Sequence, residues 1–291
     1  MSQLRAAFIG LGTMGFPMAG HLASAGIAMS VYNRTVARAQ QWQQQHSGTL
    51  ADTPADAAAG ADLVFICVGN DDDLRQVTLG PEGALNTLAA DAVLVDHTTA
   101  SAAMARELDS ACRERGSHFM DAPVSGGQQG AENGQLSVMC GGEPDIYQRV
   151  LPVIQHYARA SNLLGPAGSG QLTKMVNQIC VAGLVEALAE GVAFAKNAGL
   201  DAEKVFETLG QGAASSWQMI NRHKSMLADE FEHGFAVDWM RKDLDICLDE
   251  ASRNGSLLPV TEQVNGFYKE IQAMGGGRWD TSSLLRRLKK D

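Results

Sequence analysis

The first half of the chain alternates short apolar runs with stretches in which apolar residues recur every three to four positions. The apolar runs predict six β-strands, at residues 6–9, 28–32, 63–68, 92–96, 118–121 and 136–140. Strands that alternate with helices are joined by right-handed crossovers, which place neighbouring strands parallel. The pattern therefore predicts an α/β fold with a mainly parallel sheet up to about Leu164.

The second half carries only helical patterns after Gly170. Residues 172–198 predict one long central helix that is apolar on almost every face in its middle, and such a helix is expected to be buried between domains or subunits. Shorter helices follow up to Asp291, with breaks at residues 210–212, 255, 259 and 275–277. We expect an α/β domain over residues 1–164 and an all-α domain over residues 165–291, joined by the central helix.

Composition narrows the class of protein. A chain of 291 residues with 45% hydrophobic content can bury a large core, and its formal net charge of -10 would repel a nucleic-acid backbone. The longest apolar stretch, residues 179–185, is far shorter than the roughly 20 residues that a membrane span needs. We therefore expect neither a nucleic-acid partner nor a membrane segment.

The cysteines and the start of the chain suggest a compartment. The five cysteines are scattered singly, without a paired or histidine-associated spacing for zinc, which fits a reducing environment. Met1 to Arg5 leads directly into the first strand without a charged leader and apolar stretch. We expect a cytoplasmic protein.

A glycine-rich turn follows the first predicted strand. The segment GLGTMGFPMAGHL places Gly10, Gly12 and Gly15 at GxGxxG spacing, between a strand and a helix. In this context the glycines permit a tight turn, let the backbone approach a pyrophosphate and allow close helix packing, with the helix N-terminus facing the anion. We expect a Rossmann-type cradle for a dinucleotide, formed by Gly10, Leu11, Gly12, Thr13, Met14 and Gly15, although the same spacing also occurs in simple turns.

The residues after the second strand bear on the choice of nucleotide. Asn33, Arg34 and Thr35 stand where an NAD-selective protein usually offers a carboxylate to the ribose hydroxyls. Arg34, assisted by Arg38 and the Thr35 hydroxyl, can instead pair with a 2′-phosphate through its guanidinium fork. We therefore expect NADP (NADPH) to be preferred over NAD; the alternative is that Arg34 is an ordinary solvated loop cation.

Polar side chains interrupt the start of the central helix. In GPAGSGQLTKMVNQ, Lys174, Asn177 and Gln178 are spaced at i, i+3 and i+4 and so share one helix face. Burial of a lysine disfavours its ammonium form and lowers its pKa towards the range useful for proton transfer. A lysine in this position that merely extends to the surface is the alternative.

A second glycine-containing segment, DAPVSGG, ends the fifth predicted strand, where open α/β sheets bind ligands. Ser125 offers a hydroxyl, and Gly126 and Gly127 offer backbone amides without a side chain in the way. Such a group can hold a carboxylate, although most segments of this kind are turns.

Three consecutive acids, Asp71, Asp72 and Asp73, are interpreted as capping the start of a helix, and no metal site is expected.

Taken together, these segments resemble the β-hydroxyacid dehydrogenase family, which includes 3-hydroxyisobutyrate dehydrogenases and tartronate, glyoxylate and succinic semialdehyde reductases. The resemblance covers essentially the whole chain and includes the later segment RKDLDICLDEA, residues 241–251. It implies that Lys174 is the catalytic acid/base and that Ser125, Gly126 and Gly127 hold the substrate carboxylate. It further implies that Lys242 lies near cofactor and substrate, and that Val68 and Thr99 contact the nicotinamide half of the cofactor.

One position departs from the family pattern. Many members carry an asparagine four residues after the lysine, whereas this chain has Gln178 there and Asn177 one residue earlier. The substrate-binding amide is therefore expected from either residue.

The resemblance implies hydride transfer between NADP and a small carboxylate-bearing hydroxy acid, β or γ, or its semialdehyde or oxo acid, without a metal. Two alternatives remain open at this point: an imine reductase-like NADPH enzyme, and a non-catalytic NADP-binding sensor. Both are disfavoured by Lys174, because relatives of these kinds usually carry another residue there. The apolar central helix also suggests a second copy of the chain against it, so we expect a homodimer or a homotetramer.

Overall fold

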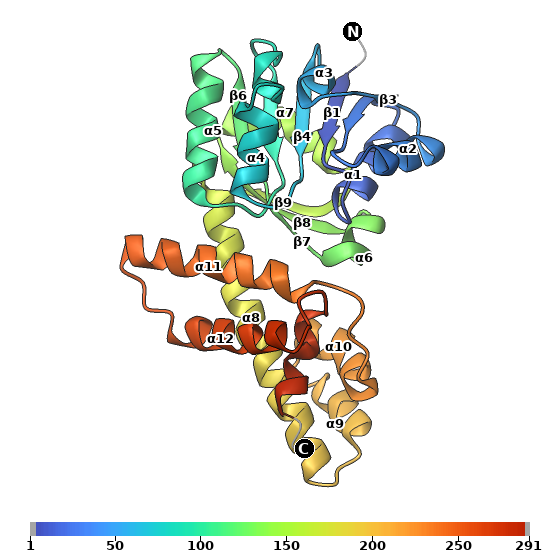
Figure 1. The fold of residues 1–291 in the computed structure, drawn as a ribbon, viewed down its shortest axis with the longest axis vertical. Helices are drawn as coiled ribbons and strands as arrows, with labels where there is room; N and C mark the ends of the chain where they lie inside the picture. Colours follow the sequence, from blue (N-terminus) through green and yellow to red (C-terminus); the bar gives the residue numbers. More distant parts are fainter. Residues whose placement is uncertain (1–3, 289–291) are drawn as a thin grey trace. The chain divides into compact units, whose positions relative to one another are not determined.

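The computed structural model describes residues 4–288. Its internal contacts divide the chain into two compact units, unit 1 ending at Lys174 and unit 2 beginning at Met175. This division falls inside one continuous helix, α8 (Ser169–Asn197), ten residues beyond the position where we expected the domain boundary. The units are described separately below (Figure 1).

Unit 1 is built on a sheet whose described part has nine strands in the order β3-β2-β1-β4-β5-β6-β8-β7, with β9 paired to β8. Strands β1 to β6 pair in parallel, and β8 is antiparallel to both β6 and β7. The mainly parallel sheet expected from the sequence is thereby confirmed. The strands are β1 (Arg5–Ile9), β2 (Ala28–Tyr32), β3 (Thr49–Leu50), β4 (Leu63–Ile66), β5 (Val93–Asp96), β6 (His118–Asp121), β7 (Val124–Ser125), β8 (Leu136–Gly142) and β9 (Ala158–Leu163).

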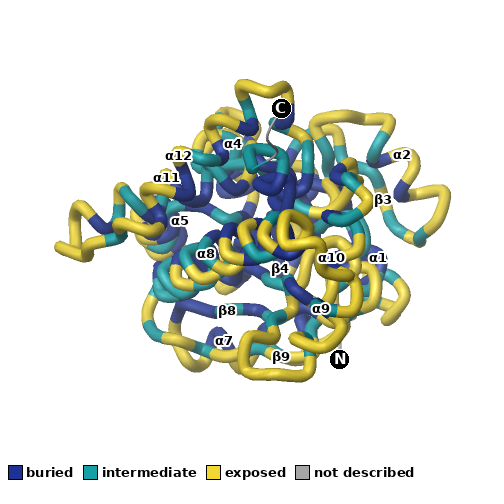
Figure 2. Tube along the Cα trace, turned by 90° about the horizontal axis from the view of Figure 1, so that it is seen from below, coloured by how far each residue is buried: buried dark blue, intermediate teal, exposed yellow. Residues whose placement is uncertain are grey.

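Helices cover both faces of this sheet. Residues of α1, α2 and α7 pack with Phe8 and Phe65 on one face, and residues of α3, α4 and α5 pack with Ile9 and Ile66 on the other. Strand β4 is consequently buried along its whole length (Figure 2). These helices are α1 (Gly15–Ser24), α2 (Val36–Gln45), α3 (Pro54–Ala58), α4 (Asp71–Leu79), α5 (Ala102–Glu114), α6 (Gly127–Glu132) and α7 (Pro144–Ile154), with a short 3-10 turn at Ala84–Asn86.

The strand order locates the ligand edge of the sheet. Strand β1 lies between β2 and β4, so successive crossovers leave it in opposite directions. In open α/β sheets this reversal opens a crevice beyond the carboxyl ends of the strands, which is where ligands bind. The turn after Ile9 and the segment after Ile66 both begin at this edge, because these residues are aligned in the parallel pair β1–β4.

Three strands were missed from the sequence, and two were predicted too long, by two residues at the end of β4 and by one at the start of β5. Strands β3 and β7 have two residues each, which is too short for a periodic pattern. Strand β9 is an outer strand whose partly exposed sequence ARASNL lacks an apolar run. The third predicted strand ends at Ile66 instead of Val68, because Cys67 already begins the loop.

Unit 2 is helical, as expected. The breaks predicted from glycine and proline separate α9 (Ala202–Leu209), α10 (Trp217–Ala228), α11 (Val237–Asn254) and α12 (Pro259–Ala273), followed by a 3-10 helix at Thr281–Leu288. Gly255 ends α11 in the left-handed conformation, with φ 79°. Residues of α8 pack at the centre, where Val185, Ala189 and Val192 join the core formed with α10, α11 and α12.

Helix α8 departs from expectation in its burial. Val176, Leu184 and Phe194 are 59%, 45% and 73% exposed, so one side of the helix is not covered within the single chain, and burial of that side between subunits stays a prediction. The helix is long and apolar enough to cross a membrane by length and composition alone. Its other side, however, buries Glu186 in an ion pair with Arg287 (3.1 Å) within the core of unit 2. These contacts are those of a core helix.

Candidate active site

The glycine-rich turn adopts a conformation that only glycine permits at two of its three positions. Gly10 has φ +95°, and a Cβ there would collide with the carbonyl oxygen of Cys67. A Cβ on Gly15 would collide with the carbonyl oxygen of Gly10. At Gly12, in contrast, a Cβ would meet no described atom within 4 Å, so the backbone there faces open space. The turn is tight on the protein side and open where a pyrophosphate would approach.

The helix that follows the turn is suited to an anion. No side chain of the described chain caps α1 by hydrogen bonding, and its first turn contains no acidic residue among those described. The first N–H groups of a helix carry partial positive charge and need acceptors. Among the residues expected to form the cradle, Gly10 and Leu11 already donate their N–H groups to Tyr32 O and Asn33 Oδ1. Donors for an anion are therefore expected from the residues that follow them at the start of the helix.

The segment after β2 is tied to this turn. The Asn33 side chain accepts a hydrogen bond from Leu11 N–H (2.8 Å), and Arg38 Nε donates to the Leu11 carbonyl (2.9 Å) while its guanidinium lies over the Phe16 ring. Arg38 thus supports the turn. Arg34 extends outward with a 76% exposed side chain and pairs with Asp73 of α4 (2.8 Å).

The loop between β5 and α5 carries Thr99 and is held by several elements. Val68 N–H donates to Thr98 Oγ1 (3.1 Å), which links the two segments expected to contact nicotinamide. Thr98 N–H donates to Asp96 Oδ1 (2.9 Å), and burial raises the pKa of the Asp96 carboxyl to about 7. Next to the loop, His97 is buried and stacks on Phe65, so it belongs to the core.

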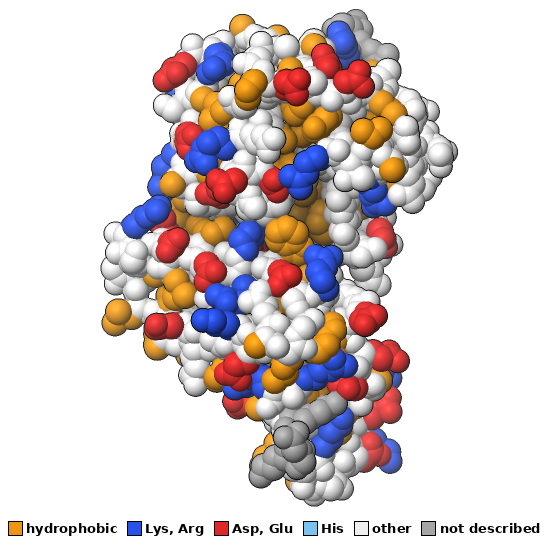
Figure 3. All heavy atoms as spheres, viewed as in Figure 1, with side chains coloured by type: hydrophobic (Ala, Val, Ile, Leu, Met, Phe, Trp, Pro, Cys, Tyr) orange, Lys and Arg blue, Asp and Glu red, His pale blue; other side chains and the backbone are white. Residues whose placement is uncertain are grey.

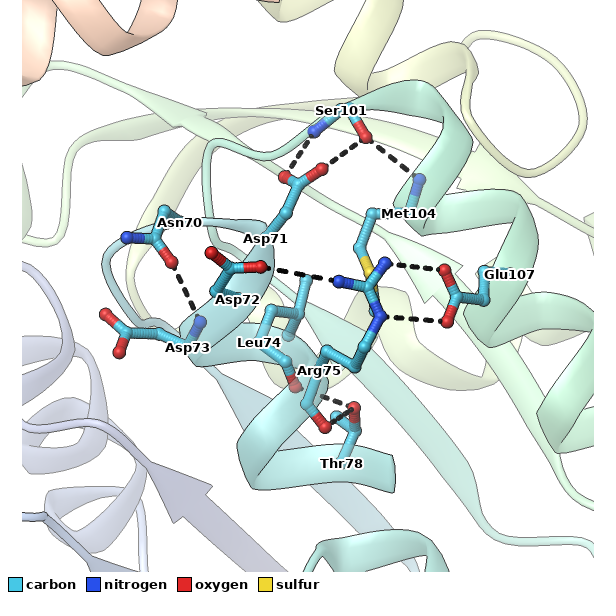
Figure 4. Close-up of polar contacts among 10 residues, drawn as sticks. All are labelled: Asn70, Asp71, Asp72, Asp73, Leu74, Arg75, Thr78, Ser101, Met104 and Glu107. Atoms are coloured by element: carbon cyan, nitrogen blue, oxygen red, sulfur yellow. Dashed lines mark hydrogen bonds and ion pairs between the residues drawn. The ribbon is translucent and has the colours of Figure 1, made fainter. Parts of the chain in front are cut away.

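The three consecutive aspartates at the start of α4 have three different partners, of which Figure 4 draws those of Asp71 and Asp72. Asp71 accepts hydrogen bonds from Ser101 N–H and Oγ, at 2.9 and 2.5 Å. Asp72 points towards Arg75 (3.5 Å) and is 96% exposed, whereas Asp73 pairs with Arg34. The helix itself is capped by the Asn70 side chain, which accepts from Asp73 N–H (2.8 Å). No cluster of three or more His, Cys, Asp or Glu residues suited to a metal occurs in the described part of the chain.

Lys174 is buried at the end of unit 1. The residue is 8% exposed, and its Nζ donates a hydrogen bond to the Val124 carbonyl (3.0 Å). Val124 directly precedes Ser125, so the ammonium group lies at the DAPVSGG segment. The two motifs that the sequence placed in separate parts of the chain are thus in contact within unit 1.

The glycines of DAPVSGG have the backbone freedom that a cradle requires. Gly126 and Gly127 have φ +136° and +63°, a region that other residues rarely adopt. A Cβ on Gly127 would meet no described atom within 4 Å, so its backbone faces open space. This arrangement leaves the Ser125 hydroxyl and the following amides in a turn at the ligand edge of the sheet.

Asp121 at the end of β6 joins this segment to the start of α8. Its carboxylate accepts hydrogen bonds from Gly168 N–H (2.7 Å) and Gln171 N–H (2.8 Å). Burial nevertheless raises the pKa of this carboxyl to about 6, because desolvation of the charge outweighs the hydrogen bonds.

In unit 2 the remaining predicted residues form a polar network. Asn177 Nδ2 donates to Gln178 Oε1 (2.7 Å), and Gln178 Nε2 donates to Asp243 Oδ2 (2.6 Å). Lys242 Nζ lies 3.1 Å from Asp243 Oδ1. The structure therefore brings together Asn177, Gln178 and Lys242 around one buried carboxylate.

Three residues of these networks were not predicted: Asp121, Gln171 and Asp243. Asp121 and Asp243 lie inside motifs that were quoted for their neighbours. An acid at the end of the apolar strand was the available signal for Asp121, whereas Asp243 lies among other charged residues and gave none. Gln171 lies one turn before Lys174 and carried the same signal as that lysine, a polar side chain on an apolar helix.

Comparison with known proteins identifies the family. Residues 5–168 match the model of the NAD binding domain of 6-phosphogluconate dehydrogenase. Residues 168–288 match the model of the NAD-binding region of NADP-dependent 3-hydroxyisobutyrate dehydrogenase. The chain belongs to the β-hydroxyacid dehydrogenase family.

Relatives of this β-hydroxyacid dehydrogenase match over nearly its whole length. An uncharacterized oxidoreductase of Shewanella frigidimarina is 62% identical over 98% of both chains. The 2-hydroxy-3-oxopropionate reductase of Escherichia coli is 32% identical and covers 98% of this chain and 97% of its own. The structure of Mycobacterium tuberculosis 3-hydroxyisobutyrate dehydrogenase with L-serine has a TM-score of 0.89 at 26% identity, covering 99% of this chain and 100% of that one.

Family membership decides between the two classes left open above, an enzyme and a non-catalytic NADP-binding sensor. The chain is an NAD(P)-dependent oxidoreductase that acts on CH–OH groups of hydroxy acids. Its fold, a mainly parallel nucleotide-binding sheet followed by a helical domain, is the fold of the 3-hydroxyisobutyrate dehydrogenases.

Proposed function

We propose that the protein is an NADP-preferring enzyme that interconverts a small β- or γ-hydroxy acid and its semialdehyde or oxo acid, with Lys174 as the acid/base. The contact between Lys174 and Val124 carries the proposal (3.0 Å). It joins a buried amine, which can transfer a proton, to the Ser125–Gly127 turn, which can hold a carboxylate. A lysine that merely reached the surface would not be 8% exposed.

The substrate carboxylate is assigned to Ser125, Gly126 and Gly127. The hydroxyl and the two backbone amides are donors, and the positive φ values at Gly126 and Gly127 fit a turn whose N–H groups point to one side. Asn177, Gln178 and Lys242 are assigned to the polar groups of the substrate. The carboxylate of Asp243 supports this role, because it orients both Gln178 and Lys242.

The residues of the chain divide the reaction between them. Bound NADPH supplies a hydride to the carbonyl carbon. Lys174 holds the carbonyl oxygen and donates a proton to it as that oxygen gains charge, and in the oxidative direction neutral Lys174 accepts the hydroxyl proton. Val68 and Thr99 are assigned to the nicotinamide half of the cofactor, and the glycine-rich turn to its pyrophosphate. No residue is assigned to a metal.

The preference for NADP is supported by Arg34 and by the absence of an acid at positions 33–35 in the sequence. Arg34 is highly exposed and is oriented by Asp73, so its guanidinium is available at the end of β2. Asn33 and Thr35 complete this segment, and the Asn33 side chain holds it against Leu11. A 2′-phosphate is the ligand that such a cation recognises.

The substrate class is supported by the relatives. The E. coli relative is named for 2-hydroxy-3-oxopropionate, a small carboxylate with an aldehyde, and the M. tuberculosis structure contains L-serine, a small carboxylate with a hydroxyl. Both ligands fit a site with one carboxylate cradle and one proton donor. A cytoplasmic location is proposed with this metabolic role.

An oligomer is proposed from the exposed side of α8. Val176, Leu184 and Phe194 form an apolar line along this helix, with exposures of 59%, 45% and 73%. We assign a second copy of the chain to this line, giving a homodimer or homotetramer. Sedimentation at micromolar concentration tests the oligomer, and a strictly monomeric profile would contradict it.

A nucleic-acid partner is not proposed. The net charge of -10, and the intermixing of acidic and basic side chains on the face drawn in Figure 3, do not favour binding to a nucleic-acid backbone.

The enzymatic proposal is tested with NADPH and a panel of 3-carbon and 4-carbon semialdehydes, glyoxylate and cyclic imines, each about 1 mM. Lys174→Ala should lower turnover of the best semialdehyde by about 100-fold or more while NADPH affinity, followed by cofactor fluorescence, changes little. Thr173→Val is the matched control on the same turn, because the Thr173 hydroxyl bonds only Ser169 O among its described contacts. Undiminished activity of Lys174→Ala would refute the proposal, and turnover of imines alone would favour an imine reductase.

A further inference from the structure

We propose that Gln171 is a positioning residue that keeps the loop carrying Thr99 in register with the helical turn carrying Lys174. The inference rests on the proposed function, since that assigns Lys174 to proton transfer and Thr99 to the nicotinamide. It concerns a side chain to which neither the motifs nor the comparisons give a role. All of the contacts that support it lie within unit 1.

Both ends of the Gln171 amide are used on the same loop. Gln171 is fully buried; its Oε1 accepts a hydrogen bond from Ala100 N–H (3.1 Å), and its Nε2 donates to the Thr98 carbonyl (2.7 Å). These two backbone groups flank Thr99. An apolar side chain of similar size would leave a buried N–H and a buried C=O without the partner that Gln171 provides, which is unfavourable.

The backbone of Gln171 is fixed from the other side. Its N–H donates to Asp121 Oδ2, and Gly168 N–H donates to Asp121 Oδ1. The first turn of α8 is thereby attached to the end of β6. Lys174 follows Gln171 at i+3 on the same helix and is held by Val124, three residues after Asp121. Gln171 thus belongs to the rigid group that carries Lys174.

The loop has other anchors, but they lead to different elements. Asp71 at the start of α4 accepts from the backbone and hydroxyl of Ser101, as Figure 4 shows. Asp96 accepts from Thr98 N–H, and Val68 N–H donates to the Thr98 hydroxyl. These bonds order the loop relative to β4, β5 and α4. The Gln171 amide links the loop to the helix of Lys174 through Thr98 and Ala100.

These hydrogen bonds would fix the position of Lys174, the proposed proton donor, relative to Thr99 and the nicotinamide, the hydride donor. Loss of the amide would leave the loop folded and the cofactor bound, but would let Thr99 and the nicotinamide shift against Lys174. A misplacement of about 1 Å is enough to lower the rate of a chemical step by about 100-fold.

The first test compares Gln171→Met with the control Thr173→Val. For Gln171→Met we expect kcat to fall by about 10- to 100-fold while the NADPH dissociation constant stays within about threefold. The primary deuterium isotope effect on kcat, measured with NADPH deuterated at the transferred position, should rise because hydride transfer becomes rate-limiting. Rates are expressed per NADPH-binding site, so that loss of folded protein is not counted as loss of turnover.

A second variant, Gln171→Glu, keeps the experiment decisive if the methionine variant does not fold. A protonated carboxylic acid can accept from Ala100 N–H and donate to Thr98 O, as the amide does, whereas the ionised form cannot donate. The charged groups on the elements packed here include the carboxylates of Asp121, Asp96 and Asp71, the ammonium of Lys174, and the guanidinium of Arg106 beside Gly168. Burial and the three acids favour protonation, so turnover relative to the unsubstituted enzyme should rise as the pH falls.

The outcomes separate the inference from the proposed function. If Gln171→Met turns over like Thr173→Val, or if Gln171→Glu stays as slow as Gln171→Met even at the lowest pH, where its carboxyl is protonated, the positioning role is overturned. Either result leaves the role of Lys174 intact when Lys174→Ala is inactive. If Lys174→Ala remains active, the proposed function itself fails, whatever the Gln171 variants do.

Discussion

The Nζ atom of Lys174 donates a hydrogen bond to the main-chain carbonyl of Val124, at 3.0 Å. A main-chain acceptor fixes the direction of the ammonium group without adding a negative charge beside it. Because Val124 belongs to the same short strand as Ser125, the position of the amine is set relative to the turn assigned to the substrate carboxylate. The distance between the Lys174 amine and this turn is thereby built into unit 1.

This relationship predicts that charge alone cannot replace Lys174. Lys174→Arg keeps a cation and a donor for Val124 O, but a guanidinium does not release its proton in the accessible pH range. Turnover should fall by about 100-fold or more, as for Lys174→Ala, while NADPH binding is retained. Single-turnover reduction followed by the absorbance of NADPH measures this. Activity of the arginine variant close to that of the unsubstituted enzyme would mean that proton transfer has another source.

Coenzyme preference should depend on Asp73 as well as Arg34. Asp73 holds the Arg34 guanidinium at 2.8 Å and adds a negative charge near the expected 2′-phosphate. Arg34→Ala should weaken NADPH binding by about 10-fold or more with little effect on NADH. Asp73→Asn should instead strengthen NADPH binding relative to NADH by about threefold, since a surface charge interaction is modest.

The control is Asp72→Asn, because Asp72 is 96% exposed and points towards Arg75. Dissociation constants for both nucleotides, measured at low and high salt, give the ratio for each variant. In an Arg34→Ala background, Asp73→Asn should lose most of its effect. An equal gain for NADH and NADPH would show that Asp73 does not act through the 2′-phosphate.

Asp243 should affect substrate binding through its two neighbours. It is 3% exposed, accepts from Gln178 and lies 3.1 Å from Lys242. Asp243→Asn keeps the shape but removes the charge, so we expect the substrate KM to rise by about 10-fold, with a smaller change for NADPH. Asp245→Asn, two residues along the same helix and 55% exposed, is the control. Similar KM values for the two variants would refute this role.

The buried His97 should make the protein less stable in acid. Burial lowers the pKa of His97 to about 4 from 6.5, and its ring nitrogens contact Ala122 O (2.6 Å) and Tyr157 OH (2.8 Å). The unfolded chain therefore binds a proton between pH 6.5 and 4 that the folded chain does not. This contribution to stability is complete above pH 6.5 and is lost as the pH falls to 4, in total on the order of 3 kcal/mol.

Urea unfolding between about pH 7.5 and pH 4.5 tests this. His97→Phe should be less stable at neutral pH, because Ala122 O and Tyr157 OH lose their partner, yet its stability should fall less steeply in acid. Asp96 acts in the opposite direction, because its raised pKa of about 7 means that ionisation destabilises the fold as the pH rises. Subtracting the free energy of unfolding of the variant from that of the unsubstituted protein at each pH removes the contribution of Asp96, which is present in both. Parallel curves would contradict the buried neutral state of His97.

Local patterns were enough to predict much of the nucleotide-binding half. The apolar runs and helical repeats predicted six of the strands and the mainly parallel sheet, because a strand buried on both faces must be apolar throughout. The glycine spacing predicted the turn after β1, and the structure shows why two of its positions exclude a side chain. Lys174 was found because a charged residue on an apolar helix is conspicuous in any sequence.

The partners of these residues were decided only by the tertiary structure. Lys174 and Val124 are 50 positions apart, and Gln171 and Thr98 are 73 apart. No local periodicity relates such distant positions, since they meet through the pairing of β5 with β6 and the return of the chain at α8. The strands β7 and β9, the antiparallel pairing of β8, the exposed side of α8 and the burial of Asp121 and Asp243 depend on the same long-range packing. The sequence by itself determined which chemical groups the protein carries, and packing determined which of them act on one another.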